Sequence, residues 1–213
     1  MTAIVYFPFF SRSYLNNEVS GTTGEIIAAG EAINGIGDTD ISLKYGLTKG
    51  RGIAVSATLT LGLPIGNDSG GSQGNLQTGD GEFNQLIQVD AGTGFPLGNT
   101  NGYANVYVGF NNRTNGFSDE FRYGFEAGVN LFKDRFTAIA RFIGVKSFRN
   151  GIPSSESTNT SVFANNAEFL SFSPEIAYKI KPNWGISAGV GTALSGKIIY
   201  ANPSYNVGVF FTW

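Results

Sequence analysis

Long stretches in which apolar and polar residues alternate constrain this chain more than any other feature. In residues 119–132, DEFRYGFEAGVNLF, every odd position from Phe121 to Leu131 is apolar, whereas the even positions hold charged residues, glycine and asparagine. Successive side chains of a β-strand point to opposite faces, so this segment predicts a strand with one apolar and one polar face. The alternation recurs, with varying strictness, in residues 2–14, 40–47, 53–65, 85–97, 103–113, 136–148, 170–179, 184–194 and 205–213. We therefore predict ten strands and an all-β fold.

The length of these strands and the links between them indicate a membrane protein. Soluble strands run about 5–6 residues, whereas a strand that crosses a bilayer needs about 9–11. A two-sheet sandwich with its apolar faces inward is the alternative. However, short links alternate with longer ones, which is typical of an outer-membrane barrel with periplasmic turns and extracellular loops. The short links are residues 48–52, 98–102, 133–135 and 181–183, and the longer ones are 15–36, 67–82, 112–118, 149–166 and 196–203.

The predicted fold is a transmembrane antiparallel up-and-down β-barrel of about ten strands, a single domain over residues 1–213, in the bacterial outer membrane. Lipid offers no hydrogen-bond partner, and only a closed sheet has no unpaired edge. The polar faces would line the lumen through Asp38, Asp40, Lys44, Asp90, Arg113, Glu120, Arg122, Glu126, Arg141, Glu175 and Lys179. The residues predicted at the two membrane interfaces are Tyr45, Phe95, Trp184, Phe211 and Trp213, with Tyr103 on the turn side and Tyr14 on the loop side.

Composition excludes several classes of function. The chain has 14 Lys and Arg against 16 Asp and Glu, which argues against a nucleic-acid partner. It has no cysteine and no histidine, so thiolate metal sites and Ser–His or Asp–His catalysis are excluded. Pairs of carboxylates on the same strand face remain candidates for catalysis. However, cations such as Lys44 and Arg122 lie on the same faces, so salt bridges in the lumen are favoured over a catalytic site. We expect no enzyme activity, metal or cofactor, and a flexible loop at 68–82.

Two motifs resemble a known family. GIGDTDISLKYGL, residues 35–47, resembles the G-x-GD-x-x-x-x-x-KY-x-L stretch of the MetA-pathway phenol-degradation transporters, which are outer-membrane barrels similar in style to the FadL-like channels. Gly37, Asp38, Lys44 and Tyr45 carry this resemblance, and TAIVYFPFF resembles the family's strand before its first long loop. Members usually have another hairpin before that strand, where this chain has Met1, so twelve strands are expected if a hairpin is missing. The resemblance implies transport of small, apolar or aromatic molecules.

The expected function is passive passage of small solutes through a polar, glycine-rich lumen. The alternatives are a non-transporting barrel that acts as an adhesin or anchor through its loops, and an engineered pore scaffold. The expected partners are outer-membrane lipids, a small-molecule solute and, through the apolar C-terminal strand 205–213, the barrel-assembly machinery. Within the first loop, residues 24–33 are expected as an irregular segment or as a short amphipathic helical turn at the mouth. Whether the lumen charges cross its axis, and so close it, is left open by the sequence.

Overall fold

The computed structural model describes residues 1–48, 52–149, 167–197, 199 and 202–212. Ten strands form one antiparallel sheet in which neighbours in the sheet follow the order β1-β6-β7-β8-β9-β10-β11-β12-β13-β14. Their bounds are β1 Thr2–Tyr6, β6 Thr39–Gly46, β7 Ala54–Leu63, β8 Asn84–Leu97, β9 Thr100–Arg113, β10 Glu120–Leu131, β11 Phe136–Ser147, β12 Glu168–Lys181, β13 Trp184–Lys197 and β14 Ser204–Phe211. The prediction of an all-β, up-and-down antiparallel sheet of ten strands is confirmed. The first strand was expected over residues 2–14 but ends at Tyr6, because residues 11–14 pair with residues 32–35 outside the large sheet.

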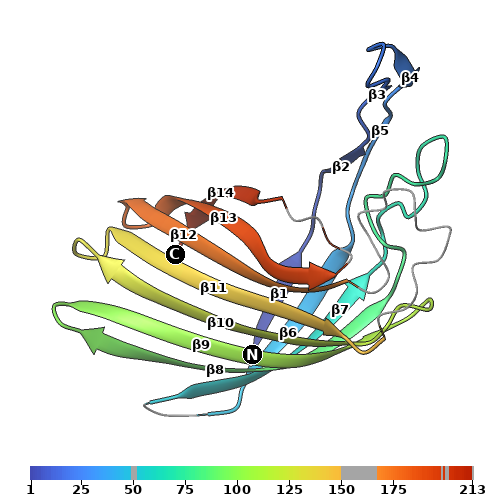
Figure 1. Ribbon diagram of the computed structural model, residues 1–213. Coiled ribbons are helices and arrows are strands. Elements are labelled where there is room, and N and C mark those ends of the chain that lie inside the picture. Colours follow the sequence, from blue (N-terminus) through green and yellow to red (C-terminus); the bar gives the residue numbers. More distant parts are fainter. Residues whose placement is uncertain (49–51, 150–166, 198, 200–201, 213) are drawn as a thin grey trace.

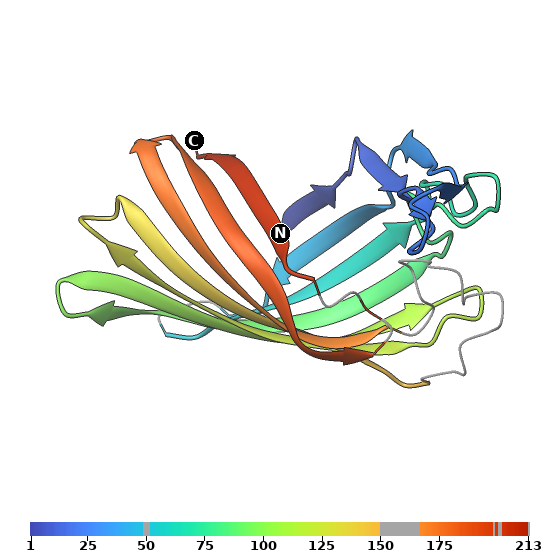
Figure 2. The ribbon, with the colours of Figure 1, turned by 45° about the horizontal axis from the view of Figure 1, so that its top comes forward.

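The sheet curls strongly, so that it has a convex and a concave side (Figures 1 and 2). Its two edges are β1 and β14, and the ladders of the described residues include none between these two strands. Four strands, β8, β9, β12 and β13, have 14 residues each, which is more than the roughly 9–11 that a tilted strand needs to cross a bilayer. Among the described residues, no helix is long and apolar enough to cross a membrane.

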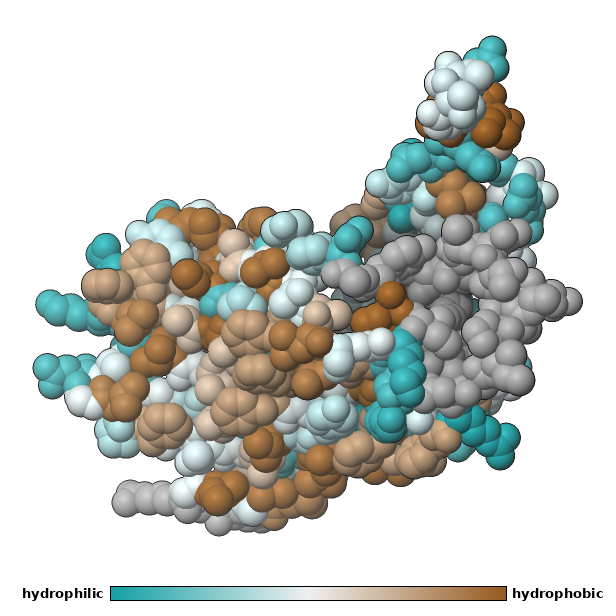
Figure 3. Space-filling model, viewed as in Figure 1, coloured by the Kyte–Doolittle hydropathy of each residue, from teal (hydrophilic) through white to brown (hydrophobic). Residues whose placement is uncertain are grey.

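Burial in this sheet is the reverse of that in a water-soluble domain. The buried hydrophobic side chains of the described residues are only Leu76 and Leu86, whereas nine Thr, Ser, Asn, Asp and Glu residues are buried. Large apolar side chains are exposed along the strands, up to 84% for Val207. The face of β8 to β13 shown in Figure 3 is mostly hydrophobic, with hydrophilic residues toward its ends. No second large sheet covers this face within the described part of the chain, so a two-sheet sandwich does not fit.

The strand register assigns each residue to one side. Glu126 lies directly opposite Arg141, and Arg141 lies opposite Ser173, so the polar positions of β10, β11 and β12 share a face. On β14, Asn206 and Gly208 lie opposite Gly189 and Ser187 of the same polar face. The odd residues Tyr205 to Phe211 therefore belong to the other, convex face, as the alternation predicts.

The first long loop, residues 7–38, forms an extended arm rather than a helical turn. Two short ribbons build it, with β2 (Ser11–Tyr14) pairing with β5 (Ala32–Gly35) and β3 (Glu18–Val19) pairing with β4 (Ile26–Ala28). The arm projects well beyond the sheet (Figure 1). The expectation of an irregular segment or a helical turn over residues 24–33 is wrong, because pairing with residues 11–19 across the loop holds this segment extended.

The second long loop, residues 64–83, is fixed to the base of the arm. The backbone N–H of Ser72 donates to Oε2 of Glu31 at 2.6 Å, and the N–H of Thr78 donates to the carbonyl oxygen of Asn67 at 2.7 Å. Leu76 is 2% exposed, and the tight approach of Ile33 and Leu76 leaves no space for a side chain at Gly70. The prediction that 68–82 is merely a flexible loop is therefore wrong for its packed part.

Candidate functional site

A cluster of charges lies where the concave face meets the loops. The guanidinium group of Arg113 donates from Nε to Oε1 of Glu82 at 2.7 Å, from Nη1 to Oε1 of Glu120 at 2.8 Å, and from Nη2 to Oδ2 of Asp80 at 3.2 Å. The ring of Phe117 covers this group, with its centroid 4.4 Å from Cζ. Arg113 thus joins β9 to β10 and to the second loop. We name Asp80, Glu82, Arg113, Glu120 and Arg122 the mouth cluster.

The two glutamates of the mouth cluster are buried, Asp80 and Arg122 are half-buried, and the group is densely hydrogen-bonded. Glu82 is 1% exposed, and its Oε2 accepts the backbone N–H of Thr114 at 2.9 Å. Glu120 accepts from Nε and Nη2 of Arg122 at 3.0 and 2.9 Å. Buried charges are tolerated only when they are paired and their remaining hydrogen-bonding positions are filled. The cluster therefore ties the second loop to the strand ends.

A second cluster lies at the middle of the concave face. Arg141 on β11 sits between Glu126 on β10, to which its Nε donates, and Glu175 on β12, whose Oε2 is 2.6 Å from Nη1. The hydroxyl of Tyr103 donates to Oε1 of Glu126 at 2.8 Å. Four neighbouring strands, β9 to β12, are linked in this way.

A third group joins β6, β7 and β8. Nζ of Lys44 lies 3.5 Å from Oδ2 of Asp90, which also lies 3.5 Å from the hydroxyl of Thr58. Nε2 of Gln88 donates to Oδ1 of Asp90 at 3.0 Å. The ion pair therefore joins β6 to β8 across the intervening strand β7, and Thr58 and Gln88 lie beside it.

The direction of these ion pairs bears on whether the lumen is open. Every ion pair among the described residues joins groups on one strand, on adjacent strands, on strands one apart, or on β9 and the loop that precedes its neighbour β8. Within the described part of the chain, none links opposite sides of the curved sheet. The charges that form these ion pairs are therefore satisfied along the wall and need no partner across the concave space.

Two tyrosine rings also lie along the wall because glycines leave room for them. The ring of Tyr107 covers Gly124, and the ring of Tyr103 covers Gly128, so that a Cβ at either glycine would overlap the ring. A glycine that faces an aromatic residue across a strand pair is a known way to seat the ring. Gly46, by contrast, faces open space. The concave glycines thus serve ring packing at some positions and leave space at others.

The parity of a residue, meaning its odd or even position along its strand, places most predicted lumen residues on one face. Asp40, Lys44, Asp90, Arg113, Glu120, Arg122, Glu126, Arg141, Glu175 and Lys179 all lie at concave register positions. Asp38 instead precedes β6 and holds the second loop, since its oxygens accept the N–H groups of Gly66 and Asp80 at 2.9 and 2.8 Å. Asp40 and Lys179 form no ion pair with the described residues.

The predicted interfacial aromatics divide into two groups. Tyr45, Phe95, Trp184 and Phe211 occupy convex register positions near the ends of their strands. Tyr103 was expected beside them but is concave, because it pairs opposite Gly128 and bonds to Glu126. Tyr14 lies on the arm, away from the sheet, so its assignment to the loop-side interface is also wrong. Trp213 lies outside the described residues.

Sequence reasoning missed several members of these clusters. Tyr103 and Tyr107 share the parity of Arg113, so the alternation of β9 contained the signal that they face inward. Asp80 and Glu82 lie in a loop, where no period exists to assign a face. Only their contacts with Arg113, which is 33 residues from Asp80 and 31 from Glu82, identify them.

The stability of the fold is expected to depend on pH through Asp80, which lies in the second loop. Burial raises the pKa of Asp80 to about 6 from a usual 3.8, the negative charges of Glu82 and Asp38 add to the rise, and the N–H of Glu82 and the charge of Arg113 oppose it. The folded state therefore binds this proton more tightly than the unfolded state. Its stabilising contribution is complete below about pH 4 and is lost as pH rises through about 6.

Asp80→Asn tests this dependence. Unfolding in urea between pH 4 and pH 8 should show the wild type gaining stability relative to Asp80→Asn as pH falls through about 6. A stability difference that stays constant over the range would show that Asp80 does not titrate in this way.

Comparison with known proteins adds one positive finding. The family model described as "Putative MetA-pathway of phenol degradation" matches residues 6–197. The match begins at the last residue of β1 and ends at the last residue of β13, so it includes all three clusters of the concave face. A search of the curated proteins finds no match.

Proposed function

Because the chain belongs to the MetA-pathway phenol-degradation family, we propose that it is an outer-membrane channel for the passive passage of small molecules, aromatic ones among them. The observation that carries this proposal is the division of the sheet into an exposed apolar convex face and a concave face whose ion pairs run along the wall. Hydrocarbon would cover the first face, and water and solute would occupy the space beside the second.

The chemistry of the concave face supports passage rather than catalysis. Its carboxylates other than Asp40 are paired with arginine or lysine, and the chain has no histidine to act as a base near neutral pH. Tyrosine and asparagine on the same face offer aromatic and hydrogen-bonding contacts that a small polar aromatic solute would use in sequence. We therefore include in the proposal that the chain is not an enzyme.

Single-channel recording of the refolded chain in planar bilayers tests the proposal. We expect steady conductance, and we expect Gly46→Trp to reduce it, because Gly46 lies at a concave position with open space around it. Ala57→Trp is the matched control, since Ala57 pairs with Tyr45 on the convex face and should leave the current unchanged. A silent bilayer with folded, inserted protein would overturn the channel proposal.

The arm supports a second candidate function, that of a barrel which anchors a binding element outside the cell. Its outer part carries exposed apolar side chains, including Val19, Ile26 and Ile27. Replacing residues 16–30 by Asn-Gly would join the flanking strands through a short turn, because Leu15 and Glu31 are already paired by a backbone hydrogen bond. Unchanged conductance with lost binding to cell surfaces would favour the anchor, and altered conductance would show that the arm acts on passage.

A further inference from the structure

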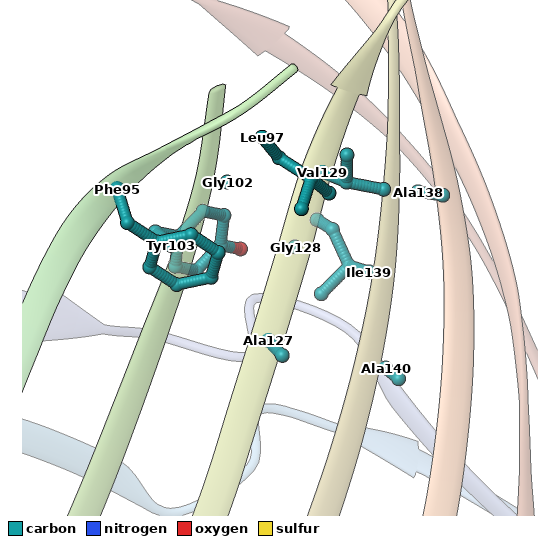
Figure 4. Close-up of a pocket in the computed structure, with 10 residues that line it drawn as sticks. All are labelled: Phe95, Leu97, Gly102, Tyr103, Ala127, Gly128, Val129, Ala138, Ile139 and Ala140. Carbon is teal, nitrogen blue, oxygen red and sulfur yellow. The ribbon is translucent and has the colours of Figure 1, made fainter. Parts of the chain in front are cut away.

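An apolar dent lies in the convex face near the turns that connect β8 to β9 and β10 to β11 (Figure 4). Its volume is about 360 Å³. Phe95, Leu97 and Val129 form its walls, and the small side chains of Ala127, Ala138 and Ala140 form its floor. Ala127 lies opposite Ala140, and Val129 lies opposite Ala138, so three of the four side chains on two successive rungs of this face are alanine.

Bulky residues close the dent at both ends along β10 and β11. The rung on the loop side pairs Phe125 with Phe142, and the rung on the turn side pairs Leu131 with Phe136. On β8 the ring of Phe95 lies over Gly102. The dent is therefore a shaped depression with an aromatic or branched side chain on each side.

The turn next to the dent is basic. Residues 132–135 connect β10 to β11, and Lys133 and Arg135 are exposed on either side of Asp134. The backbone of Lys179 adjoins this turn, since its N–H donates to the carbonyl oxygen of Arg135 at 2.9 Å, but its side chain has a concave register position. None of these cations forms an ion pair with a described residue. Ala138 follows Arg135 by three residues, about 10 Å along a strand.

We propose that the dent and this turn bind one anionic glycerophospholipid, with an acyl chain in the dent and the phosphate beside Lys133 and Arg135. Hydrocarbon fits a depression lined by apolar side chains, and basic residues at the edge of a spanning segment attract anionic headgroups. A second copy of the chain fits less well, because a two-fold contact would bring one basic turn against another. The proposal rests on the membrane location in the proposed function but does not require the lumen to conduct.

Native mass spectrometry of the detergent-refolded chain with phosphatidylglycerol tests this site. Lys133→Asn with Arg135→Gln should weaken binding by about fivefold for each cation removed. Asn suits position 133 because its backbone φ is 58°. Arg12→Gln, which removes a cation from the arm, is the matched control and should leave binding unchanged. Phosphatidylcholine with the same chains should bind the wild type more weakly than phosphatidylglycerol does.

A second pair of variants tests the dent itself. Ala138→Phe with Ala140→Phe fills it and should abolish tight one-to-one binding, whereas Ala188→Phe, on the convex face of β13, should not. Equal binding by filled and control variants, or by the charge variants and the wild type, would overturn the proposal. Bilayer conductance of the same variants separates the two proposals: lost lipid binding with normal current leaves the channel intact, and normal binding without current contradicts only the channel.

Discussion

Arg113→Met is expected to destabilise the folded state by about 3–5 kcal/mol, the usual cost of removing one partner from a buried charge cluster. Methionine keeps much of the side-chain length and apolar contact but no charge. Glu82, Glu120 and Asp80 would then face one another with only Arg122 nearby, and Glu82 is 1% exposed. The second loop would lose its tie to β9 as well. Urea unfolding in lipid vesicles, followed by tryptophan fluorescence, measures the change.

Arg12→Met is the control for this variant. Arg12 lies on the arm, and its side chain donates to Asn34 in an exposed ribbon, so the loss should stay within about 0.5 kcal/mol. A loss below about 1 kcal/mol for Arg113→Met would mean that the mouth cluster is open to water and that its ion pairs contribute little.

Val106→Arg is expected to cost about 2–4 kcal/mol if its side chain faces the middle of the bilayer. Val106 lies midway along β9 on the convex face, opposite Ala91 and Phe125, and is 49% exposed. In water, a charge at so exposed a position would change stability by no more than about 0.5 kcal/mol. The magnitude therefore reports which solvent covers the convex face.

The adjacent residue provides the control for Val106→Arg. Asn105 lies on the concave face opposite Gly92 and Glu126. Arginine there gains a carboxylate neighbour and remains in the polar space, so Asn105→Arg should be nearly neutral. Equal costs at both positions, measured by the same unfolding experiment, would contradict the assignment of the two faces.

Parity along the strands was enough to predict which residues share a face, but not which residues meet. Glu126 and Arg141 have the parity of the concave face in the sequence alone, yet their pairing depends on the register between β10 and β11. Register is fixed by turn geometry, which the alternation does not contain. At residues 98–102, for example, a five-residue link was expected, whereas Leu97 pairs with Thr100 and only two residues form the turn.

The arm and the second loop show where sequence reasoning fails for a different reason. The pairing of Ser11 with Gly35 joins residues that have no common periodic pattern, so local composition does not reveal the ribbon. In the same way, a glycine-rich segment that suggests flexibility is held by Asp38 and Glu31 of the first loop and by Arg113 of β9. Long-range contacts override local propensity in both cases.

Thiol labelling along β9 tests the two-faced membrane sheet most directly, because the chain has no cysteine of its own. Single variants Asn105→Cys, Val106→Cys, Tyr107→Cys and Val108→Cys would be refolded into vesicles and treated with a small, charged thiol reagent. The reagent reacts with the thiolate, and water is needed both for the thiol to ionise and for the charged reagent to reach it. Fast labelling at 105 and 107 with little at 106 and 108 is the predicted result, since these positions alternate between the concave and convex faces. Labelling at 106 and 108 as fast as at 105 and 107 would contradict a hydrocarbon-covered convex face, and protection of all four would contradict a water-filled concave side.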